Sequence, residues 1–321
     1  MSFNNSMRRA FLVSNGTRAT FQHASFRNLS SLHTPPPAAS KQHDHDLINL
    51  SLIGKPGSGK GTYGALLAES LQCPLIVIGD VLRTHVQRNT AIGMEIAEFQ
   101  REGRLADDAL VAKALLSHLE TIFDQHEDHP SKSSRRDGNT KFGFILDGFP
   151  RTLSQAELMF HSEDDPLSAE ASSGTIINTS LLIPWPEKFR ISFAVNIDVP
   201  DEICLDKMLG RRKCSKCNGS FNVSDVNTLD GFVMPPQLPS PYPCDKCDMD
   251  SDWEKRLDDT EEVMTRRIAE FHEKSAPVSQ FFQARNQLAT FVPFNGVSDF
   301  HLMEEMVRQK AKTTGMIPVL V

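Results

Sequence analysis

The chain has 321 residues, of which 39% are apolar, enough for one large or two smaller domains with a buried core. Its formal net charge is −7, and it becomes −12 without residues 1–43, which carry five positive side chains and no Asp or Glu. An acidic body disfavours nucleic-acid binding, and no run approaches the ~20 apolar residues of a membrane-spanning helix. We therefore expect a protein that binds neither nucleic acid nor membrane.

Residues 1–43 have the composition of an organelle transit peptide. They are basic, rich in serine and free of acidic residues, and three prolines follow one another at 35–37. This composition favours a mitochondrial destination first and a plastid second. A disordered basic tail is the alternative interpretation. We expect the folded body to span residues 44–310 and the tail at 311–321, from Lys310 onward, to be frayed.

A glycine-rich stretch, GKPGSGKGT, lies between an apolar run at 47–53 and helix-forming residues at 63–71. Its glycines permit positive φ, which lets backbone N–H groups surround phosphate oxygens at the start of a helix. Lys60 would reach the β and γ phosphates, although Gly61 stands where the general pattern has Ser or Thr. A turn without a ligand is the alternative. The candidate phosphate-binding residues are Gly57, Ser58, Gly59, Lys60, Gly61 and Thr62.

Further candidate phosphate- and Mg²⁺-binding residues follow two more predicted strands. A β-branched run at 74–78 leads into a helix that carries Arg83, which could meet a second phosphate or be solvated. Residues 84–123 have helical apolar spacing, and residues 126–141 read as a surface loop. The buried strand at 142–146 ends in Asp147, whose carboxylate can hold Mg²⁺ through water, and Arg151 can neutralise phosphate.

Two CxxC pairs have the ligand spacing of a tetrahedral structural zinc site, with a loop between them longer than is common. The four candidate ligands are Cys214, Cys217, Cys244 and Cys247. Two disulfides are the competing interpretation. Zinc would fold a small lid and would not catalyse, because four protein ligands leave no open position. Cys73 and Cys204 lack such a pattern and are expected in the core.

The remaining segments complete an α/β pattern. We expect strands at 192–198 and 290–295, and a helical stretch at 260–285 that Pro277 interrupts. Five strands with helical crossovers predict a parallel sheet with helices on both faces. Residues 161–188 read as a surface loop of unknown role.

Taken together, these motifs resemble the adenylate kinases of the nucleoside monophosphate kinase family. The matching segments are GKPGSGKGT, GDVLR at 79–83, DGFPRT at 147–152 followed by Gln155, LGRR at 209–212, RLDD at 256–259, and Arg267. The resemblance spans residues 47–310. It implies a P-loop fold with a helical monophosphate-binding insert at 79–108 and a lid at 211–256.

The resemblance also implies an activity, the reversible transfer of the γ-phosphoryl group of ATP to AMP to give two ADP. It implies a monomer that uses ATP, AMP and Mg²⁺ and holds a structural Zn²⁺ in its lid. The residues that would stabilise the transferring group are Lys60, Arg211, Arg256 and Arg267, with Asp258 and Asp259 orienting the arginines. Arg83 and Arg151 would hold the AMP phosphate, Gln155 would contact adenine, and Asp147, followed by Gly148, would organise Mg²⁺. Several convergent arginines fit a reaction that depends on positioning and charge neutralisation.

Two positions depart from the family pattern. Ile78 replaces the usual Thr or Ser before the Gly-Asp pair, and Lys207 stands where many relatives have an arginine that stacks on the ATP base. Two other functions therefore stay open. One is a kinase for another monophosphate, such as UMP or CMP, and the other is a nucleotide-binding protein with little catalytic activity.

Overall fold

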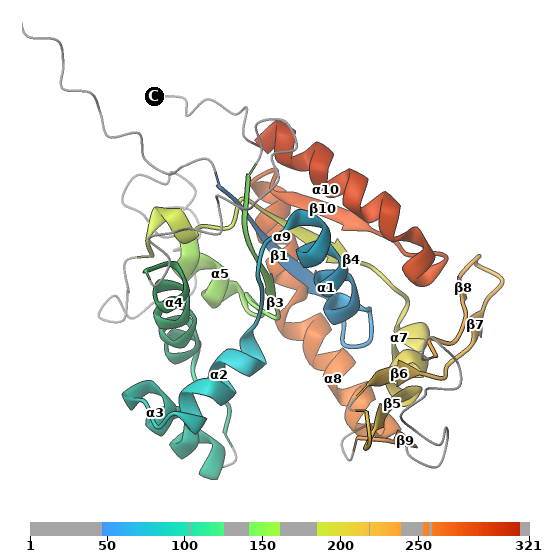
Figure 1. Cartoon of the computed structure of the whole chain (residues 1–321), viewed down its shortest axis with the longest axis horizontal. Helices are drawn as coiled ribbons and strands as arrows, with labels where there is room; N and C mark the ends of the chain where they lie inside the picture. Colours follow the sequence, from blue (N-terminus) through green and yellow to red (C-terminus); the bar gives the residue numbers. More distant parts are fainter. Residues whose placement is uncertain are drawn as a thin grey trace, which may run out of the picture. The chain divides into compact units, whose positions relative to one another are not determined.

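The computed structural model of the protein describes residues 47–102, 104–124, 141–160, 185–217, 219–238, 253–256 and 259–314. At their centre lies a five-stranded sheet in the order β10-β4-β1-β3-β2, in which all neighbours run parallel (Figure 1). The strands are β1 (Leu47–Gly54), β2 (Leu75–Val77), β3 (Lys141–Asp147), β4 (Phe193–Ile197) and β10 (Leu288–Phe291). The predicted parallel α/β fold is confirmed.

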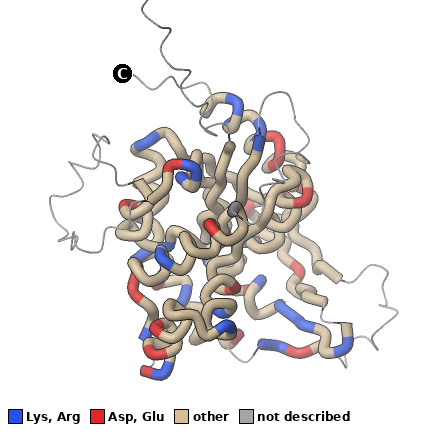
Figure 2. The backbone as a smooth tube through the Cα atoms, turned by 60° about the vertical axis from the view of Figure 1, so that its left-hand side comes forward, with Lys and Arg blue, Asp and Glu red and all other residues tan. Residues whose placement is uncertain are grey.

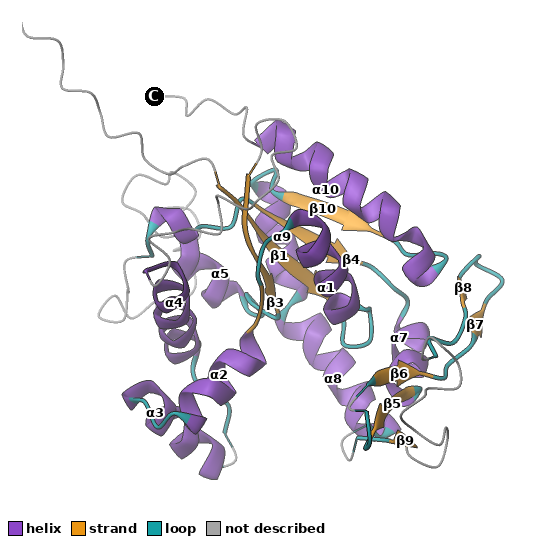
Figure 3. Ribbon diagram, in the orientation of Figure 1, coloured by secondary structure: helices purple, strands orange, loops and turns teal. Residues whose placement is uncertain are grey.

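Helices cover both faces of this sheet (Figure 3). One core joins Leu50 and Ile145 of the sheet to helix α1 (Lys60–Leu71) and helix α10 (Phe300–Thr314). The other joins Phe144 of β3 to helices α4 (Asp108–Asp124), α5 (Leu153–Phe160) and α9 (Ala276–Ala284). Neighbouring residues of β3 thus enter opposite cores, as the alternation of a strand requires.

The carboxyl ends of the inner strands meet at one edge of the sheet. Asp147 is in register with Leu52 of β1 and Val77 of β2, and Gly54 is in register with Ile197 of β4. In parallel α/β sheets, ligands bind at this edge. The fold therefore brings the glycine-rich loop and Asp147 together.

The predicted monophosphate-binding segment is helical. It contains α2 (Ile78–Gln87) and α3 (Ala91–Arg101) before α4 begins. His85 of α2 is buried, with Nδ1 2.9 Å from Thr90 Oγ1 and Nε2 3.1 Å from the carbonyl oxygen of Ala114. Thr90 also caps α3 by accepting a hydrogen bond from the N–H of Gly93. These contacts tie the three helices together. The predicted loop after them, at 126–140, lies outside the described residues.

A second, smaller sheet follows helix α7 (Asp201–Leu209), and helix α8 (Glu261–Lys274) follows it. Its strands, in the order β6-β5-β9, are β5 (Arg211–Cys214), β6 (Ser220–Asn222) and β9 (Trp253–Glu254). A hairpin of β7 (Val226–Asn227) and β8 (Val233–Met234) packs on the loop before α10. There the rings of Phe232 and Phe294 lie 4.9 Å apart, and the N–H of Val233 donates to the carbonyl of Phe294 at 2.7 Å.

The last elements differ from the sequence prediction at their ends. The helical stretch at 260–285 does break, since α8 ends at Lys274 and Pro277 lies in the first turn of α9. The final strand was expected at 290–295, but β10 ends at Phe291, two residues before Pro293. The tail was expected to fray from Lys310, yet α10 continues to Thr314, because Ala311 is buried and Lys310 Nζ donates to the carbonyl of Asn286.

The expected surface loop at 161–188 ends in core residues. Residues 161–184 lie outside the described part, but the side chain of Trp185 is buried and its ring stacks on Phe149 at 6.3 Å. Trp185 Nε1 donates to the carbonyl of Phe189, the last residue of the short helix η3 (Glu187–Phe189). The prediction of a surface loop was therefore wrong for Trp185.

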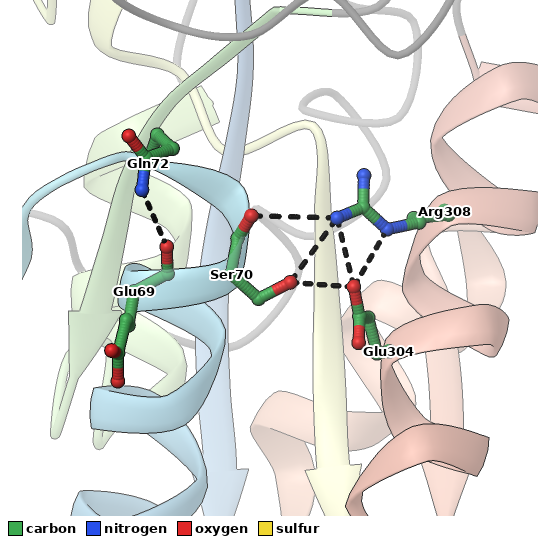
Figure 4. Close-up of polar contacts among 5 residues, drawn as sticks. All are labelled: Glu69, Ser70, Gln72, Glu304 and Arg308. Atoms are coloured by element: carbon green, nitrogen blue, oxygen red, sulfur yellow. Dashed lines mark hydrogen bonds and ion pairs between the residues drawn. The ribbon is translucent and has the colours of Figure 1, made fainter.

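Helix α10 is fastened to α1 by a polar cluster (Figure 4). Ser70 of α1 donates to Glu304, and Arg308 donates to the same carboxylate oxygen through Nε at 3.0 Å and Nη2 at 2.8 Å. The hydrogen bond from Ser70, together with Arg308, lowers the pKa of Glu304. Within the described ranges, no helix is long and apolar enough to cross a membrane.

Candidate functional site

The loop between β1 and α1 has a backbone that requires glycine. Gly57 has φ +88°, and a Cβ there would lie 2.3 Å from the carbonyl oxygen of Cys204, so no side chain fits. Gly59 has φ +94° at the N-terminal cap of α1, a conformation that L side chains rarely adopt. The loop thus leads into the positive end of a helix, where anions bind.

Lys60 begins α1 and folds back over the loop. Its Nζ donates to the carbonyl oxygens of Gly54 at 2.6 Å and Lys55 at 2.7 Å. Desolvation lowers the pKa of Lys60 to about 8, while Asp147 opposes this shift and Arg151 adds to it. A phosphate group arriving at the loop would give this desolvated ammonium a stronger partner than the carbonyls.

Asp147 ends β3 beside the loop. A Cβ on Gly61 would lie 3.7 Å from its Oδ2. Desolvation raises the pKa of Asp147, and the positive charges of Lys60 and Arg151 oppose that rise. A desolvated carboxylate at the loop is suited to a divalent cation. Among the described residues, however, no group of three or more His, Cys, Asp or Glu could hold a metal.

The predicted arginines fall into two groups. Desolvation and the charges of Arg151 and Arg211 lower the pKa of Lys60, so both arginines lie near the loop lysine. Desolvation and the charge of Arg267 lower the pKa of Arg151, so Arg267 lies near Arg151. Arg211 Nη1 is 3.7 Å from Oδ1 of Asp259, a buried carboxylate with no hydrogen-bond partner among the described residues. This arrangement fits the predicted role of Asp259 in orienting an arginine.

The arginines of the second group are more exposed. Arg83 is exposed on α2 and pairs with Asp80 one turn earlier. Arg256 is exposed beyond β9, and its carbonyl accepts the N–H of Asp259 at 3.1 Å. Asp258 lies outside the described residues. Figure 2 shows basic and acidic residues interspersed along the described backbone.

Gln155 is buried, and its amide is hydrogen-bonded at both ends. Its Oε1 accepts the N–H of Arg151 at 2.7 Å, and its Nε2 donates to Asp108 Oδ1 at 2.8 Å. Asp108 also accepts a hydrogen bond from Thr152 Oγ1 at 2.7 Å. No sequence pattern points to Asp108, because its partners stand more than forty residues away in the chain.

A second contact that no sequence motif indicates joins the glycine-rich loop to helices α7 and α8. Lys55 Nζ pairs with Asp201 Oδ1 at 2.6 Å, and Asp201 Oδ2 lies 2.8 Å from His272 Nε2. Asp201 opens α7 and His272 belongs to α8. Because the carbonyl of Lys55 holds Lys60, this carboxylate links the loop to both helices.

The two departures from the family pattern take up structural positions. Ile78 is 3% exposed and lies in the core, 3.1 Å from where a Cβ on Gly148 would stand. Lys207 Nζ donates to the carbonyl oxygens of Met234 at 3.1 Å and Ser224 at 3.4 Å, and desolvation lowers its pKa. The ammonium of Lys207 is thus bound to the hairpin that follows β6.

Only half of the predicted zinc ligands are described. The N–H of Cys217 donates to Cys214 Sγ at 3.4 Å, and the N–H of Gly219 donates to Cys217 Sγ at 3.4 Å. Cys244 and Cys247 lie outside the described residues. Cys73 and Cys204 are buried as predicted, and burial raises the pKa of each thiol to about 12.

Comparison with known proteins gives the family. The adenylate kinase family model matches residues 52–171. A probable chloroplastic adenylate kinase 6 of Oryza sativa is 31% identical over 257 residues, which cover 78% of this chain and 74% of the relative. The chain belongs to the adenylate kinase family. It is a nucleoside monophosphate kinase with the P-loop α/β fold of that family.

Two further relatives of the kinase carry different names. An adenylate kinase of Caldicellulosiruptor bescii is 31% identical over 241 residues, which cover 75% of this chain and 89% of the relative. A GTP:AMP phosphotransferase of Plasmodium falciparum is 30% identical over 255 residues, which cover 79% of this chain and 93% of the relative. A relative named adenylate kinase and one named GTP:AMP phosphotransferase are therefore about equally similar to this chain.

Proposed function

We propose that this kinase transfers the γ-phosphoryl group of ATP to AMP reversibly and gives two ADP. A phosphate oxygen of AMP attacks the γ-phosphorus, and the bond from that phosphorus to the β-phosphate oxygen breaks. The observation that carries this proposal is the convergence of Lys60, Asp147 and Arg151 at the carboxyl edge of the sheet, where their charges act on one another. Such a site neutralises charge on a transferring phosphoryl group.

The other residues have supporting roles in this proposal. Arg211 and Arg267 approach the transferring group, together with Arg256 from the segment after β9. Arg83 and Arg151 hold the phosphate of AMP. Asp147 would hold Mg²⁺, which would neutralise phosphate charge, and its desolvated carboxylate fits a cation. The protein acts as a monomer.

Steady-state assays with the full chain test the reaction. ATP is supplied with AMP, CMP, UMP or GMP, and ADP formation is followed through a coupled enzyme system. Fastest turnover with AMP is expected, and faster turnover with CMP would overturn the choice of acceptor. CMP is the sharpest competitor because cytosine, like adenine, presents an amino group beside a ring-nitrogen acceptor. Tight ATP binding without ADP formation would contradict catalysis altogether.

We also propose that Cys214 and Cys217 hold Zn²⁺ together with Cys244 and Cys247. The support is local, since each described sulfur accepts a backbone N–H, as metal-bound thiolates do. Zinc there would stabilise the fold of the segment around β5 and β6 and would not react. Metal analysis of the purified chain should find about one zinc per chain, and Cys214→Ser should remove most of it. Two disulfides detected by mass spectrometry would contradict the site.

Finally, we propose that residues 1–43 direct the kinase to an organelle. The support is their basic, acid-free composition and the word chloroplastic in the name of the rice relative. The composition favours mitochondria, and the relative favours plastids. The full chain with a fluorescent protein at its carboxyl end should localise to one of these organelles in a cell that has both. A cytosolic signal would contradict targeting.

A further inference from the structure

The amide of Gln155 is held at both ends by groups that cannot exchange roles. Its side chain is almost fully buried, with the whole residue 5% exposed. Nε2 donates to Asp108 Oδ1 at 2.8 Å, and Oε1 accepts the backbone N–H of Arg151 at 2.7 Å. A carboxylate only accepts hydrogen bonds and a backbone N–H only donates them. The nitrogen must therefore face Asp108 and the oxygen must face Arg151.

Asp108 is itself fixed in place. Its second oxygen, Oδ2, accepts the hydroxyl hydrogen of Thr152 at 2.7 Å, and the Oγ1 of Thr152 in turn accepts the backbone N–H of Gln155 at 3.1 Å. Asp108 opens α4, whereas Thr152 and Gln155 follow β3. If the amide were reversed, its oxygen would face the carboxylate oxygen of Asp108, and its NH₂ group would face the backbone N–H of Arg151. Both bonds would be lost at a buried position, so the orientation is strongly held.

We propose that Asp108 sets the acceptor-base preference of the kinase by fixing the orientation of the Gln155 amide. The inference rests on the proposed function and on the contact with the monophosphate base that the family resemblance implies for Gln155. With one N–H and one oxygen lone pair in use, the amide keeps one donor and one acceptor in a fixed order. For the proposed acceptor AMP, this order is the one that meets an edge with an amino donor beside a ring-nitrogen acceptor, as in adenine and cytosine. It opposes an edge with an oxo group beside a ring N–H, as in hypoxanthine, guanine and uracil.

Inosine monophosphate is the sharpest probe of this orientation. IMP has the size and sugar phosphate of AMP, but its base has an oxo group and a ring N–H in place of the amino group and ring acceptor. The phosphate contacts of Lys60, Arg83 and Arg151 are the same for both substrates. A difference in kcat/KM between AMP and IMP therefore reports on the base contact alone. When a buried polar group must face a base edge that it cannot hydrogen-bond, kcat/KM for that substrate typically falls by ~100-fold or more.

The test compares Asp108→Asn with Asp107→Asn in the full chain. An asparagine at 108 can donate as well as accept, so residue 108 no longer fixes the Gln155 amide, and only the N–H of Arg151 still favours one orientation. Asp107 precedes it and accepts the N–H of Leu110 at 2.7 Å, a bond that asparagine also makes. The AMP:IMP ratio of kcat/KM should fall at least about tenfold in Asp108→Asn and stay unchanged in Asp107→Asn. Since both values come from one preparation, the ratio does not depend on the folded fraction.

The outcomes separate the two proposals. AMP turnover with an unchanged ratio in Asp108→Asn would overturn the role of Asp108 and leave the proposed function standing. Equal kcat/KM for AMP and IMP in the unchanged chain would also overturn it, and that measurement needs no variant to fold. No turnover of AMP at all would overturn the proposed function and this inference with it. Asp108→Glu, which retains a carboxylate, should keep the AMP:IMP ratio closer to that of the unchanged chain.

Discussion

The charge on Lys60 is expected to control nucleotide affinity above neutral pH. Desolvation lowers its pKa to about 8, whereas an exposed lysine titrates near ~10.4. Phosphate groups bind the ammonium form, so nucleotide binding should raise this pKa and take up a proton from solution. Affinity for ATP should therefore begin to fall at a pH well below that at which surface lysines lose their charge.

The size of the effect follows from the pKa. Lys60 is about half protonated at pH 8 and about one tenth protonated at pH 9. ATP binding at pH 8 should take up about half a proton, and Kd should rise by up to about tenfold per pH unit above that. Folding shifts this pKa below its unfolded value, so the shift opposes stability. The cost, about 3 kcal/mol, is full below pH 8 and disappears as the pH rises past ~10.4.

Calorimetry can measure the proton directly. Binding of a non-hydrolysable ATP analogue is recorded near pH 7, 8 and 9 in buffers of different ionisation enthalpy, and the slope against that enthalpy gives the protons taken up. Lys60→Met should bind more weakly and lack the uptake that peaks above pH 8, while Lys60→Arg should keep its charge throughout. Equal proton uptake at pH 8 in the unchanged chain and in Lys60→Met would refute the assignment of this proton to Lys60.

Three further changes test other parts of the structure. Lys55→Met should leave Asp201 without its lysine, raise KM for ATP several-fold and lower the free energy of unfolding by about 1 kcal/mol; unchanged initial rates and an unchanged melting temperature would contradict the coupling. Glu304→Gln should cost about 1–2 kcal/mol in urea unfolding at pH 7, because Arg308 loses its ionic partner. The pKa of Glu304 is lowered in the folded state, so this difference should shrink as the pH falls and that carboxylate is protonated; a gap that stays constant with pH would argue against it. Asp147→Asn should keep the fold but lower kcat/KM about 100-fold or more in Mg²⁺, and wild-type rates from this variant would exclude Asp147 as the Mg²⁺ group.

Local motifs were sufficient to predict where the glycine-rich loop and Asp147 lie in the fold. The glycines of the loop have positions that only their φ values and close contacts permit, so their spacing carries structural information. Asp147 could be located because a buried apolar run must end at the edge of a sheet. Register then brings Asp147 beside the loop, and parallel pairing with β1 and β2 leaves little freedom in that placement.

Contacts between distant segments could not be predicted in this way. Asp108 and Gln155 are 47 residues apart, and Lys55 and Asp201 are 146 apart. Single aspartates at helix starts are common, and nothing in their neighbourhoods indicates which side chain they will meet. The errors at Trp185 and Lys310 have the same origin. The segment at 161–188 begins with polar residues, and Lys310 lies close to the end of the sequence. Contacts with remote residues order both segments, through Phe149 for Trp185 and through Asn286 for Lys310.

The hairpin of β7 and β8 limits the conformations open to the small sheet. Phe232 packs on Phe294, Lys207 of α7 binds the carbonyls of Ser224 before β7 and of Met234 in β8, and Asn222 at the end of β6 exchanges two backbone hydrogen bonds with Gln237. The hairpin thus ties the small sheet to the loop before α10 as well as to α7. A tethered segment samples fewer conformations before a nucleotide arrives. Any ordering of this segment around a bound nucleotide therefore forfeits less conformational entropy, and more of the phosphate-binding free energy remains available for affinity.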